Sequence, residues 1–222
     1  MLLAGWALAL GVVLLTGLLL TRVLADRWPL TSEDGVNRAL ASARTPAGDN
    51  ITWLLSRLGD TGTVVAACTV AVIVLRLVLH RWRESIFVAA CTIGQSVVFL
   101  FTTLAIERER PDVPKLDDSP PTSSFPSGHT GASLVLCLAL AVVVHRQVRR
   151  QWARWSLIVL LLLIPLSVAA GRLYRGMHHP TDIAGSVLNA VLVVLITSWV
   201  LNRYAPEDAP AAEDEPSGTK SA

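Results

Sequence analysis

The sequence predicts an all-α fold, an integral membrane bundle of six transmembrane helices. Of its 222 residues, 52% are hydrophobic and only 16% are charged, and the mean hydropathy of +0.52 is high for a soluble domain of this size. The apolar residues also cluster in six long blocks, and a helix needs roughly 20 such residues to cross the hydrocarbon core of a bilayer. The expected spans are about 2–24, 62–80, 85–106, 130–147, 155–174 and 183–203.

The first block, LLAGWALALGVVLLTGLLL, has some features of a secretory signal, because Val23-Leu24-Ala25 would offer a cleavage site. It lacks a basic region before the apolar run, and that run is longer than the core of a usual signal peptide. We therefore expect a retained span.

The remaining blocks carry the side chains typical of helices that end at a membrane surface. Arg76 lies near the end of the second block, where its long side chain can reach the headgroups. Trp152 and Trp155 precede the fifth block, while Trp199 and Tyr204 lie near the end of the sixth, as expected for interfacial aromatic belts. These positions support helices that begin and end at the two surfaces of a membrane.

Two other segments fall outside the spans. Residues 51–58, ITWLLSRL, are too few to cross a bilayer and fit either a helix along the membrane interface or an amphipathic connector. Residues 205–222 are rich in Pro, Ala, Asp and Glu and have no apolar periodicity, which predicts a disordered acidic tail. We therefore expect one membrane domain over residues 1–204 followed by this tail.

The loop charges predict how the bundle is oriented. The short loops around 80–83 and 145–154 are basic, which places them in the cytoplasm. Six spans then put both termini in the cytoplasm, and residues 25–61, 107–129 and 175–182 outside. The expected location is the cell membrane, with the bilayer as a partner. The net charge of +2 is too small to indicate nucleic acid binding, and the sequence does not indicate an oligomeric state.

Two of the expected outer segments, 107–131 and 171–185, bring together residue types that suit phosphate chemistry. They contain Arg110, Arg172 and three of the five histidines of the chain. Guanidinium groups match the oxygens of a phosphate. Ser127 and Gly128 open the fourth span, where unpaired backbone N–H groups and the helix dipole favour an anion. We therefore expect the start of this span to hold a phosphoryl group beside His129.

A pair of histidines can divide the work of phosphoryl transfer, since a neutral ring attacks phosphorus and a protonated ring supplies the leaving group with a proton. The attacking ring needs an acceptor for its other nitrogen. Asp182, four residues after His178, is a natural acceptor. Pro180 can begin the sixth span at its first helical position, which puts Asp182 in the first turn.

Here the motifs resemble those of a known family, the type 2 phosphatidic acid phosphatase superfamily. Pro126-Ser127-Gly128-His129 matches its P-S-G-H motif, and Arg110-Pro111 matches the end of the R-P motif before it. Arg172, His178 and Asp182 have the spacing of its S-R-x5-H-x3-D motif. The resemblance extends from about residue 103 to residue 185, and the six-span layout is similar as well.

The resemblance implies a membrane lipid phosphatase that works without a metal ion or another cofactor. It implies that His178 is the nucleophile and forms a phosphohistidine, that Asp182 orients it, and that His129 protonates the leaving group and later helps to activate water. The implied phosphate ligands are Arg110, Arg172, Ser127, Gly128 and, as an additional cation, Arg108. The expected substrate is a lipid phosphate, first of all a polyprenyl diphosphate.

The chain departs from the family pattern at two positions. Thr103 stands where the R-P motif begins with lysine, so one cation is missing, and Arg108 is expected to compensate. Gly171 stands where serine is usual. Outside the motifs, Asp117 and Asp118 are expected in a solvated loop, and Arg175 is interpreted as an ordinary interfacial cation.

Several other functions remain open at this point. The same site would serve a lipid phosphotransferase, or a phosphatase for phosphatidylglycerol phosphate or phosphatidic acid. A non-catalytic lipid-binding or transport protein would fit a site weakened by Thr103. A vanadate-dependent haloperoxidase would share the pocket chemistry, but those relatives are soluble, and six spans argue against it.

Overall fold

The computed structural model describes residues 1–28, 30–118 and 121–204, and every regular element in this part of the chain is helical. A π-helical turn (Leu19–Val23) extends α1, and a short 3-10 turn (Leu30–Ser32) precedes α2. The helices are α1 (Leu2–Leu18), α2 (Glu33–Ser42), α3 (Pro46–Arg57), α4 (Thr61–Leu79), α5 (Arg83–Ala105), α6 (Gly128–Gln147), α7 (Gln151–Tyr174) and α8 (Pro180–Tyr204).

Within the described residues, six helices are long and apolar enough to cross a membrane: α1 with its π-helical turn, α4, α5, α6, α7 and α8. Each coincides with one of the blocks in the sequence, so the predicted all-α fold with six membrane helices is confirmed. The predicted tail, residues 205–222, lies outside the described residues.

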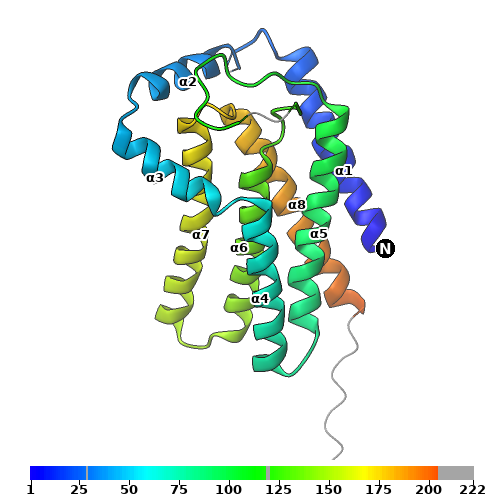
Figure 1. Cartoon of the computed structure of the whole chain (residues 1–222). Helices are drawn as coiled ribbons and strands as arrows, with labels where there is room; N and C mark the ends of the chain where they lie inside the picture. Colours follow the sequence, from blue (N-terminus) through cyan, green and yellow to red (C-terminus); the bar gives the residue numbers. More distant parts are fainter. Residues whose placement is uncertain (29, 119–120, 205–222) are drawn as a thin grey trace, which may run out of the picture.

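Helix α6 occupies the centre of the bundle and packs against α4, α5, α7 and α8 (Figure 1). Close packing depends on a small residue at Gly131, because a Cβ atom there would lie only 2.2 Å from the Gln95 side chain of α5. Helix α1 is an integral part of the same bundle. Its Ala9 and Val13 are fully buried, and the Trp6 indole donates to Thr197 of α8 at 3.4 Å. Packing of this kind favours retention of α1, which stays a prediction.

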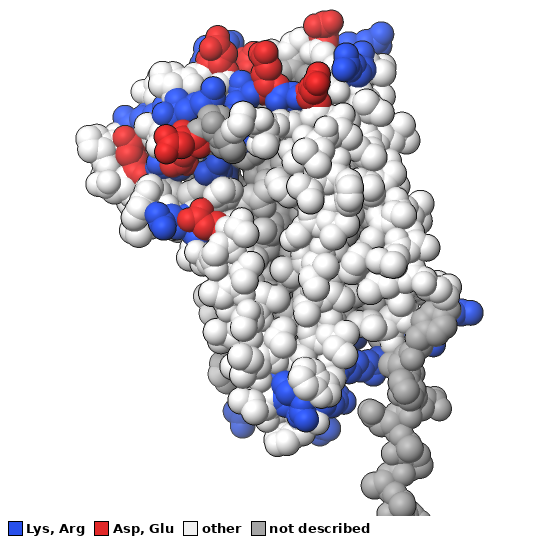
Figure 2. All heavy atoms as spheres, turned by 45° about the vertical axis from the view of Figure 1, so that its right-hand side comes forward, with Lys and Arg blue, Asp and Glu red and all other residues white. Residues whose placement is uncertain are grey.

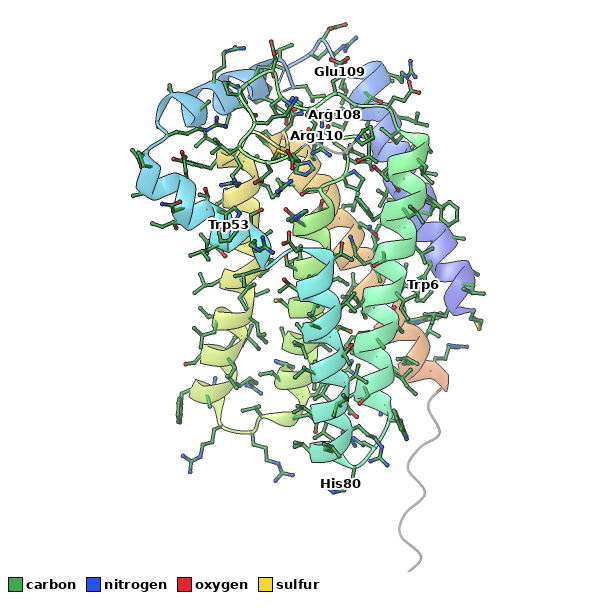
Figure 3. All side chains as sticks on the ribbon, in the orientation of Figure 1. Trp6, Trp53, His80, Arg108, Glu109 and Arg110 are labelled. Atoms are coloured by element: carbon green, nitrogen blue, oxygen red, sulfur yellow. The ribbon has the colours of Figure 1, made fainter. Side chains whose placement is uncertain are left out.

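Charged side chains gather at the two ends of the bundle and leave an uncharged band between them (Figure 2). Helices α2 and α3 and the loop between α5 and α6 lie together at one end (Figure 1), whereas His80 lies at the other (Figure 3). The two motif-bearing segments therefore share one end of the molecule, as the predicted topology requires. Which end faces outside stays a prediction.

Helix α2 lies in a segment for which the sequence predicted no helix, because that segment is polar. Helix α3 contains most of residues 51–58, for which a helix along the membrane interface was one of the two predictions. That α3 lies along this interface stays a prediction. Local start signals are nevertheless present. Ser32 precedes two acidic residues in the first turn of α2, and Pro46 takes the first position of α3. Thr45 caps α3, because its hydroxyl accepts the N–H of Gly48 at 3.1 Å. Residues of these two helices contact arginines of the motif-bearing segments, namely Glu33 with Arg108 and Ser56 with Arg172.

Candidate active site

A cavity of about 620 Å³ lies at the end of the bundle where the two motif-bearing segments meet. His129 and Gly128 reach it from the start of α6, His178 from the segment between α7 and α8, Arg172 from the end of α7, and Arg110 from the loop after α5. Both histidines and both arginines that the motifs single out therefore line one space. In Figure 3, Arg110 lies in the loop above the ends of the central helices.

The ring of His178 is buried and held at one nitrogen. Its Nδ1 lies 2.8 Å from the carbonyl oxygen of Ser124, so this N–H donates to the carbonyl and the lone pair of the neutral ring is on Nε2. The carboxylate of Asp182 lies 3.6 Å from the same Nδ1, too far for a good hydrogen bond. The orienting acceptor is therefore Ser124, which the motif did not indicate, and Asp182 acts on the ring through its charge.

The pKa of His178 is lower than that of an ordinary histidine. Burial is the main cause, because it disfavours the charged ring. The charge of Asp182 opposes this effect, while Arg172 and Arg110 add to it. A neutral ring with a free Nε2 is the form that a nucleophile requires.

His129 has a partner that the motif does not contain. Its Nε2 lies 2.9 Å from Oδ1 of Asp60, the residue directly before α4. No local sequence pattern links these two positions, because they are 69 residues apart.

Arg172 is tied to two residues of other segments. Its Nη1 donates to the hydroxyl of Ser56 in α3 at 3.0 Å and to Asp117 in the α5–α6 loop at 2.9 Å. Asp117 also accepts two hydrogen bonds from Arg175, at 2.8 and 2.6 Å, and Arg175 is only 4% exposed. Burial alone would raise the pKa of Asp117, but the hydrogen bond from Arg175 and the charges of both arginines hold it below its usual range.

This ion-pair cluster corrects two expectations. Asp117 does not lie in a solvated loop, since it bridges Arg172 and Arg175 at the edge of the cavity. Arg175 is not an interfacial cation, because its guanidinium is buried and also donates to the carbonyl of Leu116 at 2.8 Å. Together these contacts fasten the α5–α6 loop over the end of α7.

Two of the predicted phosphate ligands do not line the cavity. Ser127 is fully buried; its N–H donates to the carbonyl of Asp182 and its hydroxyl to Thr130. Arg108 donates to Asp182 at 2.5 Å and to Glu33 of α2 at 2.7 Å. Ser127 thus joins the starts of α6 and α8, and Arg108 holds the carboxylate of Asp182, while their role as phosphate ligands stays a prediction.

Gly128 keeps its predicted place beside the cavity. A Cβ atom there would lie 2.9 Å from the ring of Phe99, so the start of α6 has no room for a side chain. The first backbone hydrogen bond that closes this turn runs from the N–H of Gly131 to the carbonyl of Ser127. The amides before Gly131 belong to the first turn, where helix geometry supplies no partner.

The two departures from the family pattern have structural counterparts. Thr103 faces the loop before α6, with its hydroxyl 3.5 Å from the carbonyl of Ser123, and it does not line the cavity. Gly171 packs against α3, because a Cβ atom there would lie 3.3 Å from the carbonyl of Thr52. A serine at this position would therefore press α3 away from α7.

The part of the cavity between α4 and α5 forms its apolar end. Val64 and Val65 of α4 and Phe99 and Leu100 of α5 line it, together with the smaller polar side chains of Thr92 and Ser96. Val65 and Leu100 are also 56% and 50% exposed, so the cavity reaches the outer surface of the bundle between these two helices. One cavity thus joins a group of histidines and arginines to the apolar surface that would face lipid. In the described residues no group of three His, Cys, Asp or Glu side chains could hold a metal ion.

The fold defines a class of protein, a multi-pass membrane protein, and its cavity brings histidines and arginines close to the apolar surface of the bundle. The family model of the PAP2 superfamily matches residues 86–205, more than half of the chain, and the protein belongs to this superfamily. The matched region contains every motif residue named above. It does not contain α2, α3 or Asp60.

Known proteins resemble the chain in sequence and in fold. The bacitracin transport permease protein BcrC of Bacillus licheniformis is 26% identical over 113 residues, and the chain spans about half the length (51%) of this curated relative. A transmembrane PAP2-type phosphatidylglycerolphosphate phosphatase from Bacillus subtilis superimposes with a TM-score of 0.75 at 15% identity, covering 90% of this chain and 96% of that one. Aquifex aeolicus LpxE superimposes with a TM-score of 0.59 at 19% identity, covering 74% and 93%.

Proposed function

We propose that this protein is a metal-independent lipid phosphatase that cleaves the phosphate ester or anhydride of a lipid through a phosphohistidine at His178. The observation that carries the proposal is the shape of the cavity. Its polar end gathers two histidines and two arginines from separate segments, and its apolar end opens toward lipid between α4 and α5. A phosphate would occupy the polar end while the hydrocarbon chain extends along the apolar end.

In the first step, the lone pair on Nε2 of His178 attacks phosphorus. The bond from phosphorus to the lipid oxygen breaks, its electron pair stays on that oxygen, and His129 in its protonated form supplies the proton. Arg110 and Arg172 bind the phosphate oxygens, and the first amides of α6 add hydrogen bonds. The dephosphorylated lipid then leaves along the apolar end.

In the second step, a water molecule attacks the phosphohistidine. The phosphorus–nitrogen bond breaks and its electron pair returns to Nε2 of His178, while His129, now neutral, accepts the proton from water. Inorganic phosphate is released and both rings return to their starting forms. His129 therefore acts as an acid in one step and as a base in the other.

Unpaired donors at the polar end support an anionic ligand. The Nε–H groups of Arg110 and Arg172 are buried without a hydrogen-bond partner. Buried donors are normally paired, and exceptions call for a missing partner. A phosphate between the two guanidinium groups would supply it.

A polyprenyl diphosphate is the first choice of substrate. If the end of the bundle that carries the cavity faces outside, as the basic loops predict, the site suits a lipid carrier that is recycled on that face. Phosphatidylglycerol phosphate and phosphatidic acid have the same combination of phosphate and hydrocarbon chain, so a direct comparison must decide among them.

The proposal is tested by phosphate release from a panel of these lipids by the purified protein, with EDTA present. We expect release from at least one lipid, highest for the polyprenyl diphosphate, and no release by His178→Ala. Release that requires an added metal ion, or that persists in His178→Ala, would contradict the proposed mechanism.

A further inference from the structure

A short turn between α3 and α4 brings a carboxylate to His129. Gly59 makes this approach possible, because a Cβ atom there would lie 2.8 Å from the carbonyl oxygen of His129 and 2.9 Å from Val168. The next residue, Asp60, places its Oδ1 at 2.9 Å from Nε2 of His129. Both Asp60 and His129 line the cavity. The turn therefore packs directly on the start of α6 and places the carboxylate of Asp60 beside the ring of His129.

We propose that Asp60 is a positioning residue that holds the ring of His129 in place and favours its protonated form for the leaving group. The inference rests on the function proposed above, in which His129 supplies that proton. A carboxylate in hydrogen-bond contact favours the imidazolium over the neutral ring, because the charged form gains both the hydrogen bond and the ion pair.

The other charged groups around His129 show why a dedicated carboxylate is needed. Arg172 lines the same cavity as His129, and its positive charge acts against a protonated ring. Asp117 and Asp60 also line this cavity, and their negative charges act in favour of it. Of these, Asp60 makes the hydrogen bond, and its second oxygen lies 3.6 Å from Nε of the exposed Arg57.

The hydrogen bond also assigns the protons of the ring. Nε2–H is held by Asp60, so the proton on Nδ1 passes to the lipid oxygen when the bond from phosphorus to that oxygen breaks. The neutral ring then has its lone pair on Nδ1 and can accept a proton from the attacking water. Asp60 donates no proton in either step and only holds the ring.

The test compares two phosphate esters that differ in their need for an acid. Dodecyl phosphate releases an alkoxide unless it is protonated, whereas p-nitrophenyl phosphate releases a stable anion. We expect Asp60→Asn to lower kcat for dodecyl phosphate by about 10- to 100-fold and kcat for p-nitrophenyl phosphate by less than about threefold. Asp60→Glu, which keeps a carboxylate, is expected to recover part of the loss.

A double variant separates positioning from a general loss of structure. Since Asp60 acts through His129, Asp60→Asn in a His129→Ala background should cost little more than His129→Ala alone. Asp26→Asn is the matched control, an exposed carboxylate outside the cavity. Its kcat should equal that of the wild type for both esters.

The outcomes distinguish the inference from the proposed function. If Asp60→Asn lowers kcat equally for both esters, or if its effect multiplies with that of His129→Ala, the positioning role is contradicted while the phosphatase activity stands. If the wild type releases phosphate neither from these esters nor from any lipid of the panel, the proposed function fails and the inference fails with it. If it acts only on a lipid of the panel, Asp60→Asn is measured on that lipid, where a loss of kcat of about 10- to 100-fold is expected and an unchanged kcat would contradict the positioning role.

Discussion

His178 and Asp182 lie close together, yet the hydrogen bond that fixes the ring goes to the carbonyl oxygen of Ser124. The backbone just before the P-S-G-H motif thus orients the ring of His178, the proposed nucleophile, which belongs to the other motif. This contact makes the two motifs depend on each other, since displacement of the segment around Ser124 would free the ring. Asp182 contributes charge and holds the N–H of His179 at 2.8 Å.

The protonation of His178 gives a first prediction. Because burial lowers its pKa, the ring stays neutral to a lower pH than an ordinary histidine with a pKa of 6.5. NMR of the histidine-labelled protein in detergent should therefore show a titration midpoint below 6.5, with His178→Ala assigning the signal. Arg172→Ala should move the midpoint upward, because that arginine disfavours the charged ring. A midpoint at or above 6.5 in the wild type would contradict this description of the nucleophile.

Asp117 gives a second prediction at the residue scale. Its carboxylate bridges two buried guanidinium groups, so Asp117→Ala leaves Arg175 without its bidentate partner. We expect the free energy of unfolding to fall by about 1–3 kcal/mol and the Tm in detergent to fall with it. Asp118→Ala is the control, because the next carboxylate is exposed. Equal Tm values for the two variants would show that the bridge contributes no stability.

At the scale of elements, α2 is bound to the segment around His178, between α7 and α8, and to the first turn of α8. Glu33 accepts the N–H of Thr181 at 2.7 Å in the first turn of α8, and it also accepts Arg108 at 2.7 Å. Asn37 donates to the carbonyl of His178 at 3.0 Å. Both residues are buried although α2 is short and polar. Helix α2 therefore acts as a cap on the start of α8, from outside the region that the family model matches.

A substitution that removes the main contacts of this cap gives the third prediction. Glu33→Ala leaves the N–H of Thr181 unpaired and removes one of the two carboxylates from Arg108, so the free energy of unfolding should fall by about 1–3 kcal/mol. Turnover should fall as well, since Arg108 also holds Asp182. The neighbouring Asp34 is more than half exposed, and Asp34→Ala should change the Tm little. A Glu33→Ala protein with unchanged Tm and turnover would contradict the capping role.

The elements also show what the sequence could predict and what it could not. Long apolar blocks identified all six membrane helices, because burial in lipid imposes that composition on every turn. Helix α2 has no such requirement, and its signal is local, at Ser32. Helix α3 was indicated only in part, by the amphipathic residues 51–58, and its start by Thr45 and Pro46. In the site, the motifs identified His129, His178, Arg110 and Arg172. They could not indicate Asp60 or Asp117, whose partners are distant in the chain and meet them only after folding.

At the scale of the whole molecule, the uncharged band of the surface (Figure 2) is consistent with the residues that line the cavity. The polar end of the cavity lies among charged loops, and its apolar end lies where the bundle surface becomes apolar. A lipid with a phosphate headgroup would thus keep its headgroup among the loops and its chain in the bilayer.

The orientation of the bundle is the fourth prediction. The basic loops predict that His80 faces the cytoplasm and that Asp112, in the α5–α6 loop, faces outside. Single cysteines introduced at these two positions, after replacement of the native cysteines by alanine, can be tested in intact cells with a membrane-impermeant thiol reagent. We expect labelling at position 112 and none at position 80. The reverse pattern would place the site in the cytoplasm and remove the argument for a carrier recycled outside.

The central claim, that the ring of His178 forms a bond to phosphorus, is tested most directly by trapping the intermediate. The purified protein is mixed briefly with a polyprenyl diphosphate that carries ³²P in the terminal phosphate, and then quenched with alkali and detergent. We expect radioactive protein whose label survives base, is lost in acid, and is absent from His178→Ala. Label that remains in His178→Ala, or wild-type turnover in which the phosphorus is shown by chiral labelling to undergo a single inversion, would contradict a covalent intermediate on this residue.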